Sequence, residues 1–283
     1  MDGVKQAGTF INSRWEQKAS HTMKISMPDG CAIHAESHGH GDTAIVFLHG
    51  IMMSGAVFKR QVSALSGDYR VVTVDLRGFG QSDKPESGYS GERFVADLKY
   101  IIDHLNLKRP VIAGWSMGGA IALAFAASFP GVASRLVLIG TTPCLIQRPD
   151  WPDAVPPAAA EQLGQALATD YGAGVEAFCH MMFPEAHSED EMNFVRQIML
   201  ATPANVTLTC MQNLGGSDLR PVLGAICEPV SVLCGTEDMV CPPGASRFLA
   251  DKLGGELTLI AGGGHCAFLT KADEFNSALR AGL

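Results

Sequence analysis

A serine flanked by glycines is the first feature of this sequence that could do chemistry. Residues 114–118 read Gly-Trp-Ser-Met-Gly, which fits the pattern G-x-S-x-G. In that pattern the serine stands on a strained turn between a strand and a helix, and its hydroxyl is displayed as a nucleophile. A serine that only caps a helix is commoner. The assignment of Ser116 as a nucleophile therefore depends on partners elsewhere in the chain.

A serine hydroxyl needs a base to take its proton, and the chain offers a histidine and an acid after the serine. His265 follows three glycines, and the ordinary pKa of a histidine lies near neutrality. Asp238 follows the strand-like run 229–234 and could orient His265 and stabilise its imidazolium form. Glu237 is the adjacent alternative. We predict a catalytic triad of Ser116, His265 and Asp238.

Acyl transfer also needs backbone donors for the oxyanion of its transition state. The residue after the serine, Met117, is expected to supply one N–H, and Ile51 is expected to supply the other. Ile51 follows the apolar run 44–48 and the turn His49–Gly50. The alternative interpretation is that this segment is only a tight turn. In either case we expect His49 to be structural and to pack beneath the site.

The remaining histidines and acids fit structural roles better. His34, His38 and His40 lie close together, but their spacing matches no standard set of zinc ligands. We expect them on a surface hairpin, with no metal and no other cofactor. Asp75 ends a strand-like run and is expected to hold the turn at 77–80 by local hydrogen bonds.

These residues must be positioned by elements that alternate along the chain. The strand-like runs are 23–27, 31–37, 44–48, 69–75, a run around Val111, 135–139, 229–234 and 256–260, and the helix-like runs are 57–65, 94–105, 120–127, 245–253 and 272–279. This alternation predicts an α/β protein with a mostly parallel central sheet and helices on both faces. Ligands bind at the carboxyl ends of such strands, where Ser116, Asp238 and His265 are found.

The alternation is interrupted by a proline-rich segment and a stretch with only helical patterns. We therefore predict a polar lead-in at 1–22, a core made of 23–142 and 225–283, and an inserted helical cap at 143–224. The cap carries many Met and Phe residues, and a subset of them should form an apolar pocket for an acyl group. Phe178 and Met182 are the candidates named for this pocket.

Composition excludes several classes of function. The chain has 283 residues and a net charge of −8, with no run of Lys and Arg, so we expect no nucleic-acid partner. No stretch approaches the roughly 20 apolar residues of a membrane span, and the first 20 residues lack the apolar core of a secretory signal. The eight cysteines contain no CxxC pair and are expected to be reduced thiols, which predicts a cytoplasmic location.

Five motifs carry a resemblance to a known family. They are HGIM at 49–52, DLRGFGQSD at 75–83, GWSMGG at 114–119, GTEDMVCPP at 235–243 and GGGHCAF at 262–268. Through them the chain resembles the α/β-hydrolase family over residues 23–283. The resemblance implies the α/β-hydrolase fold with a helical lid. It also excludes the dehalogenase and epoxide hydrolase branches, which have aspartate as the nucleophile.

A narrower resemblance follows from residues after the serine. With GWSMGG, the pairs Pro143–Cys144 and Trp151–Pro152 are similar to the pimeloyl-acyl-carrier-protein methyl ester esterases of biotin synthesis. That resemblance implies a serine carboxylesterase with the triad and oxyanion donors named above, and it places Trp115 in the acyl pocket. The implied partner is an acyl ester carried on acyl-carrier protein.

The lid departs from that family in its charge. The family grips an acidic carrier protein with lid arginines, whereas residues 145–216 of this chain contain two arginines, Arg148 and Arg196, against nine Asp and Glu. Two other functions stay open. One is a cofactor-free hydrolase with the same triad that acts on a lactone, as enol-lactonases do, or on a carbon–carbon bond. The other is a ligand receptor without catalytic activity. The acyl chain length, the alcohol group and the oligomeric state are also left open.

Overall fold

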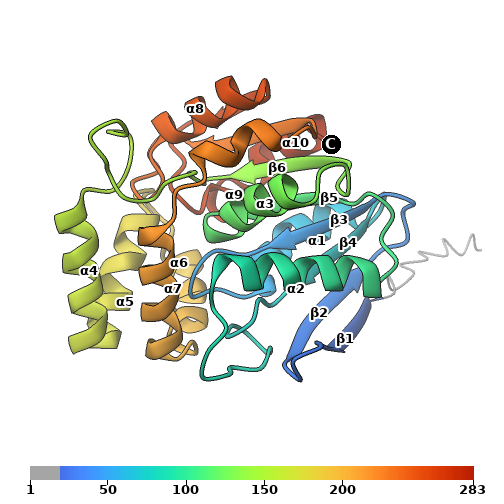
Figure 1. Ribbon diagram of the computed structural model, residues 1–283. Coiled ribbons are helices and arrows are strands. Elements are labelled where there is room, and N and C mark those ends of the chain that lie inside the picture. Colours follow the sequence, from blue (N-terminus) through green and yellow to red (C-terminus); the bar gives the residue numbers. More distant parts are fainter. Residues whose placement is uncertain (1–19) are drawn as a thin grey trace, which may run out of the picture.

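The computed structural model describes residues 20–283, and eight strands of this part of the chain form one sheet (Figure 1). The strands are β1 (Ser20–Ser26), β2 (Ala32–His38), β3 (Ala44–Leu48), β4 (Arg70–Val74), β5 (Val111–Trp115), β6 (Arg135–Ile139), β7 (Val230–Gly235) and β8 (Glu256–Ile260). Their order in the sheet is β1-β2-β4-β3-β5-β6-β7-β8. The pairs β1–β2 and β2–β4 are antiparallel and every other pair is parallel. The predicted mostly parallel α/β sheet is confirmed.

The central strands are apolar on both faces because both faces are covered. Every residue of β3, β5 and β7 is buried, as expected for parallel strands packed between layers of helices. The edge strand β8 instead alternates between exposed and partly buried residues along most of its length. Most of the predicted lead-in, residues 1–19, lies outside the described residues, and its last three residues belong to β1.

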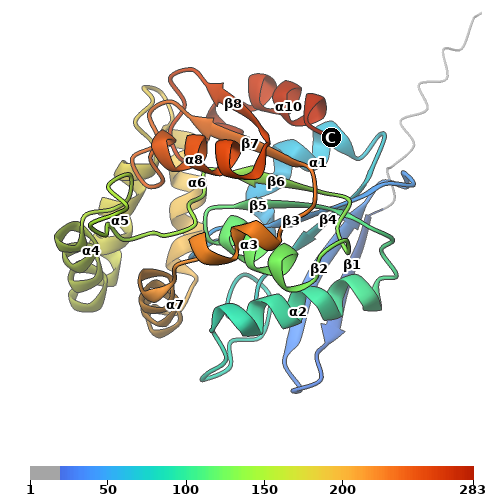
Figure 2. The ribbon, with the colours of Figure 1, turned by 45° about the horizontal axis from the view of Figure 1, so that its top comes forward.

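Helices cover the two faces of the sheet. The helices are α1 (Lys59–Leu65), α2 (Gly91–His104), α3 (Met117–Ser128), α8 (Pro243–Leu253), α9 (Ala267–Thr270) and α10 (Ala272–Ala281), with a short 3-10 helix, η1, at Gly55–Phe58. Helices α2 and α3 pack on each other in front of the central strands, and α1 lies behind them in contact with α10 (Figure 2).

Four helices between β6 and β7 form a separate layer, which we call the cap. They are α4 (Pro157–Thr169), α5 (Tyr171–Met182), α6 (Glu189–Leu200) and α7 (Ala204–Gly216), and a second 3-10 helix, η2 (Arg220–Ala225), leads back to β7. They stand together beyond one end of the sheet, at the left of Figure 1. Helix α5 packs against α4 and α6, and α4 also contacts α7. Across the described residues, no helix combines the length and the apolar character that crossing a bilayer requires.

A buried ion pair ties α2 to the turn after β4. Arg77 donates from Nε and Nη2 to the two carboxylate oxygens of Asp97, at 2.8 and 2.9 Å. The Nη1 atom of Arg77 also lies 2.9 Å from Asp29. The hydrogen bonds that Arg77 donates to Asp97 raise the pKa of the Arg77 guanidinium above its ordinary value. A charge buried in this way depends on its partner, since an unpaired buried charge is costly.

The substitution Asp97→Asn is therefore expected to lower the free energy of unfolding by about 3 kcal/mol or more. The matched control is Asp103→Asn on the same helix, which removes the exposed pair Lys99–Asp103 and should cost no more than about 0.5 kcal/mol. Urea denaturation of both variants measures the difference. Equal losses in the two variants would show that the buried pair has no special role.

Candidate active site

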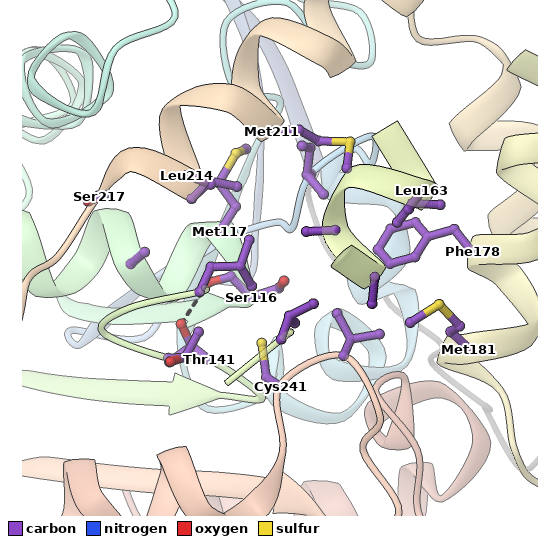
Figure 3. A pocket seen from close by; sticks show the side chains of 18 of the residues that line it. Ser116, Met117, Thr141, Leu163, Phe178, Met181, Met211, Leu214, Ser217 and Cys241 are labelled. Atoms are coloured by element: carbon purple, nitrogen blue, oxygen red, sulfur yellow. Dashed lines mark hydrogen bonds between the residues drawn. The ribbon is translucent and has the colours of Figure 1, made fainter. Parts of the chain in front are cut away.

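Ser116 occupies the turn between β5 and α3 in a strained backbone conformation. Its φ is 54° and its ψ is −118°, a region that residues with a Cβ seldom adopt. The turn is held by hydrogen bonds on both sides. The Ser116 N–H donates to the carbonyl of Ile139 at 3.0 Å, and the Gly119 N–H donates to the Ser116 carbonyl at 2.9 Å. The Thr141 hydroxyl donates to the same carbonyl at 2.8 Å (Figure 3).

The glycines around Ser116 are required by close packing. A Cβ on Gly114 would lie 2.3 Å from the carbonyl oxygen of Gly118, and a Cβ on Gly118 would lie 2.2 Å from that of Leu48. Both distances are far inside van der Waals contact with backbone atoms. The G-x-S-x-G spacing therefore has a steric cause: α3 crosses directly over the ends of β3 and β5.

His265 and Asp238 form a buried hydrogen-bonded pair. His265 Nδ1 lies 2.8 Å from Asp238 Oδ2, and neither side chain has any exposed surface. The other oxygen, Oδ1, accepts from the backbone N–H groups of Val240 and Cys241 at 2.9 and 2.8 Å. These two donors fix the orientation of the Asp238 carboxylate toward His265. Glu237 is exposed, so Asp238 is the acid that contacts the histidine.

The second nitrogen of the His265 ring differs from the first in its contacts. Within the described residues, Nε2 is buried without a hydrogen-bond partner. The structure therefore does not join Ser116 to His265 by a hydrogen bond, and the Ser116 side chain lies beside the thiol of Cys241 at the cavity wall. Burial raises the pKa of that thiol well above its ordinary value, and the nearby Asp238 charge adds to this effect. Since Nδ1 faces the carboxylate, the hydrogen-bond pattern assigns the proton to Nδ1 and leaves Nε2 free to accept one.

Trp115 and Met182 were expected to line an acyl pocket, but both contact the backbone of His265 instead. The Trp115 indole N–H donates to the His265 carbonyl at 3.0 Å, and the two rings lie 5.1 Å apart. The Met182 carbonyl accepts the His265 N–H at 3.1 Å. Trp115 is almost completely buried and also packs against Phe268. Its indole thus supports the histidine loop, and Trp115 is not among the residues that line the cavity beside Ser116.

A cavity of about 410 Å³ opens between Ser116 and the cap. The Ser116 side chain lies at its base, and Phe178 and Met181 of α5 lie at its far side (Figure 3). The residues that line it are Ile51, Ser116, Met117, Ala120, Thr141, Thr142, Pro143, Leu145, Val155, Ala159, Ala160, Gln162, Leu163, Ala166, Ala177, Phe178, Met181, Met211, Leu214, Ser217, Leu219, Val240 and Cys241. All of these side chains are uncharged, so the cavity suits a neutral, mainly apolar group.

The two residues expected to donate to an oxyanion both line this cavity with Ser116. Met117 is the first residue of α3, where a backbone N–H has no acceptor within the helix. Ile51 lies in the turn after β3, which His49 holds in place. The Leu76 N–H donates to His49 Nε2 at 2.9 Å, so the proton of the ring is on Nδ1, which donates to the Gly50 carbonyl at 2.7 Å.

Several neighbours of the site differ from expectation or were not anticipated. His34 was expected on a surface hairpin, but it is buried and contacts Asp75 at 2.9 Å. Asp75 also accepts from the N–H groups of Gly55 and Gln81, both at 2.7 Å, which fits its predicted role in holding a turn. The position of Cys241 beside Ser116 could not be predicted from the sequence. The sequence shows only that Cys241 follows Asp238 by three residues.

Comparisons with known proteins agree on one family. The family model described as alpha/beta hydrolase fold matches residues 43–272. A pimeloyl-[acyl-carrier protein] methyl ester esterase of Stenotrophomonas maltophilia is 33% identical over 255 residues, which cover 88% of this chain and 95% of the relative. An esterase from Exiguobacterium antarcticum superposes with a TM-score of 0.89 at 27% identity, covering 92% of this chain and 98% of its own. A bromoperoxidase from Bacillus anthracis superposes with a TM-score of 0.86 at 28% identity, covering 93% and 99%.

His49 is expected to make stability depend on pH. Burial lowers the pKa of His49, so below about pH 6.5, the ordinary histidine pKa, the unfolded chain binds a proton that the folded chain excludes. The free energy of unfolding should then fall as the pH drops, by up to about 1.4 kcal/mol per pH unit from this residue. Urea denaturation between pH 7.5 and 5 should show a shallower loss for His49→Asn than for the wild type. An identical pH dependence would exclude a neutral His49.

Proposed function

The chain belongs to the α/β-hydrolase family, and on that premise we propose that it is a serine carboxylic ester hydrolase that acts through an acyl-enzyme. One observation carries the proposal. The strained Ser116 stands at the base of a neutral cavity. His265 is hydrogen-bonded to Asp238 through Nδ1, and its buried Nε2 has no hydrogen-bond partner in the part of the chain that the structure describes. A strained serine and a free base in one site are what nucleophilic catalysis requires.

In the proposed first step, the Ser116 hydroxyl turns from Cys241 to His265 and attacks the ester carbonyl. His265 Nε2 takes the hydroxyl proton, and the Asp238 carboxylate stabilises the imidazolium that results. The carbonyl oxygen becomes an oxyanion and accepts from the N–H groups of Ile51 and Met117. Each such donor contributes about two to three orders of magnitude in rate.

In the second step, the tetrahedral intermediate collapses and the carbon–oxygen bond to the alcohol breaks. The imidazolium of His265 gives its proton to the departing alkoxide, so the alcohol leaves neutral and an ester of Ser116 remains. A water molecule then loses a proton to His265 and attacks that ester. The acid is released, and Ser116 recovers its hydroxyl proton from the histidine.

The lining of the cavity favours an ester whose acyl chain carries no charge. An unpaired carboxylate would lose its hydration there without gaining a counter-ion. The relative from Stenotrophomonas maltophilia is named for a pimeloyl methyl ester, whose chain is neutral as long as the ester is intact. We therefore infer that the pimeloyl methyl ester group is the candidate substrate, and that cleavage gives a product with a carboxylate that the cavity does not favour.

The charges of the cap favour a free ester over one bound to an acidic carrier protein. Arg196 is engaged by Glu176, with nitrogen–oxygen distances of 2.5 and 2.9 Å. Arg148 lies 3.8 Å from Asp218 and donates to the sulfur of Cys144 at 3.2 Å. Both arginines of residues 145–216 are thus already engaged, among nine acidic residues. An acidic partner would meet net repulsion at this surface.

Ser116→Ala is expected to lower kcat for ester cleavage by about 10⁶-fold, as in other serine triads. The matched control is Ser128→Ala, an exposed serine at the far end of α3, which should keep wild-type turnover. Initial rates with a p-nitrophenyl ester measure both variants. Full activity of the Ser116 variant would remove the basis of the proposed mechanism.

Dimethyl pimelate should be cleaved with a kcat/KM about 100-fold above that of monomethyl pimelate, because only the second carries a charge into the cavity. Product analysis by mass spectrometry should show that cleavage stops after one ester. Pimeloyl methyl ester on acyl-carrier protein should react no faster than its free pantetheine thioester. Equal rates for dimethyl and monomethyl pimelate would contradict the inference that the cavity selects an uncharged acyl chain. A much faster reaction of the ester on acyl-carrier protein would contradict only the inference that the carrier is not recognised.

A further inference from the structure

We propose that Glu185, a residue of the cap, is a positioning residue that fixes the loop carrying His265. The inference rests on the proposed function, because it concerns the same histidine. Glu185 follows α5 by three residues and is partly buried against the segment between β8 and α9. It belongs to the cap, whereas the loop that it contacts belongs to the core.

One carboxylate oxygen of Glu185 accepts two hydrogen bonds from the histidine loop. The Gly264 N–H donates to Oε1 at 2.7 Å, and the Thr270 hydroxyl donates to the same atom at 2.6 Å. Gly264 directly precedes His265, and Thr270 ends the short helix α9 that follows it. Glu185 therefore connects both ends of the segment that presents the imidazole.

The backbone around Glu185 encloses the same loop. The Met182 carbonyl accepts the His265 N–H at 3.1 Å. A Cβ on Gly264 would lie 2.3 Å from Pro184 and 2.7 Å from the Met182 carbonyl oxygen. Residues 182–185 of the cap thus hold the loop by hydrogen bonds and by direct contact, while Trp115 of the core holds the His265 carbonyl at 3.0 Å.

Glu185 also contributes a charge close to the catalytic pair. Burial raises the pKa of the Cys266 thiol well above its ordinary value, and the charges of Asp238 and Glu185 add to that effect. Oε2 of Glu185 is buried without a hydrogen-bond partner among the described residues. The polar contacts that fix this side chain are therefore those from Oε1 to the loop.

These contacts give the cap a second role besides covering the cavity. The position of His265 relative to Ser116 depends on residues 182–185, so a displacement of this segment from the core would also displace the base. Loss of the Glu185 acceptor should leave the Gly264 N–H unsatisfied and the loop mobile. A loose base takes up the productive geometry less often, which lowers kcat and leaves substrate affinity unchanged.

The test compares Glu185→Ala with Glu185→Gln. The alanine variant should lose about 10- to 100-fold in kcat with KM within about twofold of the wild type. The glutamine variant retains an oxygen that accepts both hydrogen bonds, so it should restore most of the lost kcat. Glu189→Ala, an exposed carboxylate at the start of α6, is the control and should keep wild-type kinetics. If the alanine variant does not fold, Thr270→Val removes one of the two donors and should lower kcat by about threefold or more.

A second measurement does not depend on turnover. The proton on His265 Nδ1, shared with Asp238, should give a low-field NMR resonance in the wild type and in Glu185→Gln, and Glu185→Ala should broaden or shift it. A displaced resonance together with a kcat loss that glutamine restores supports the proposal. Wild-type kcat and an unchanged resonance in Glu185→Ala, or an effect on KM alone, would overturn it. If the wild type cleaves no ester, the proposed function fails, and the resonance alone decides the role of Glu185.

Discussion

The turn at Ser116 is the constraint on which the rest of the site depends. A residue with a Cβ held at φ 54° and ψ −118° costs about 1–3 kcal/mol and persists only when its surroundings enforce it. Here they do so from three strands, because β3, β5 and β6 end side by side. Glycines at 114 and 118 let α3 approach those ends, and hydrogen bonds from Thr141 and to Ile139 fix the serine between them. The strain displays the Ser116 side chain at the base of the cavity.

The rest of the site is assembled around that turn by the topology of the sheet. The loops after β3, β7 and β8 supply Ile51, Asp238 and His265, because the carboxyl ends of parallel strands share one edge. The cap then closes this edge with uncharged side chains and contacts the histidine loop through Glu185. The site thus combines a buried base, His265, with an uncharged cavity, and the cap contacts both of them. This combination suits the cleavage of a neutral ester.

Much of this architecture could be predicted from the sequence, and the failures have physical causes. Continuous apolar runs such as 44–48 identify buried parallel strands directly. The helix predicted at 120–127 begins at Met117 in the structure. The prediction started it too late because glycines have a low helix propensity, whereas close packing requires glycine at positions 118 and 119 of this helix. The choice between Asp238 and Glu237 rests on burial, which adjacent residues do not reveal. The prediction that Trp115 lines the acyl pocket was wrong, because Trp115 packs under the His265 loop instead. A resemblance in sequence does not show toward which face of the sheet the last side chain of a strand points.

The central claim is that Ser116 is a nucleophile activated by His265, and covalent labelling tests it most directly. The protein would be treated with a fluorophosphonate, which reacts with activated serines, and the modified peptide identified by mass spectrometry. The account predicts one adduct per chain, on Ser116, and its loss in a His265→Ala variant that remains folded. An unlabelled Ser116 in the wild type, or equal labelling without His265, would contradict it.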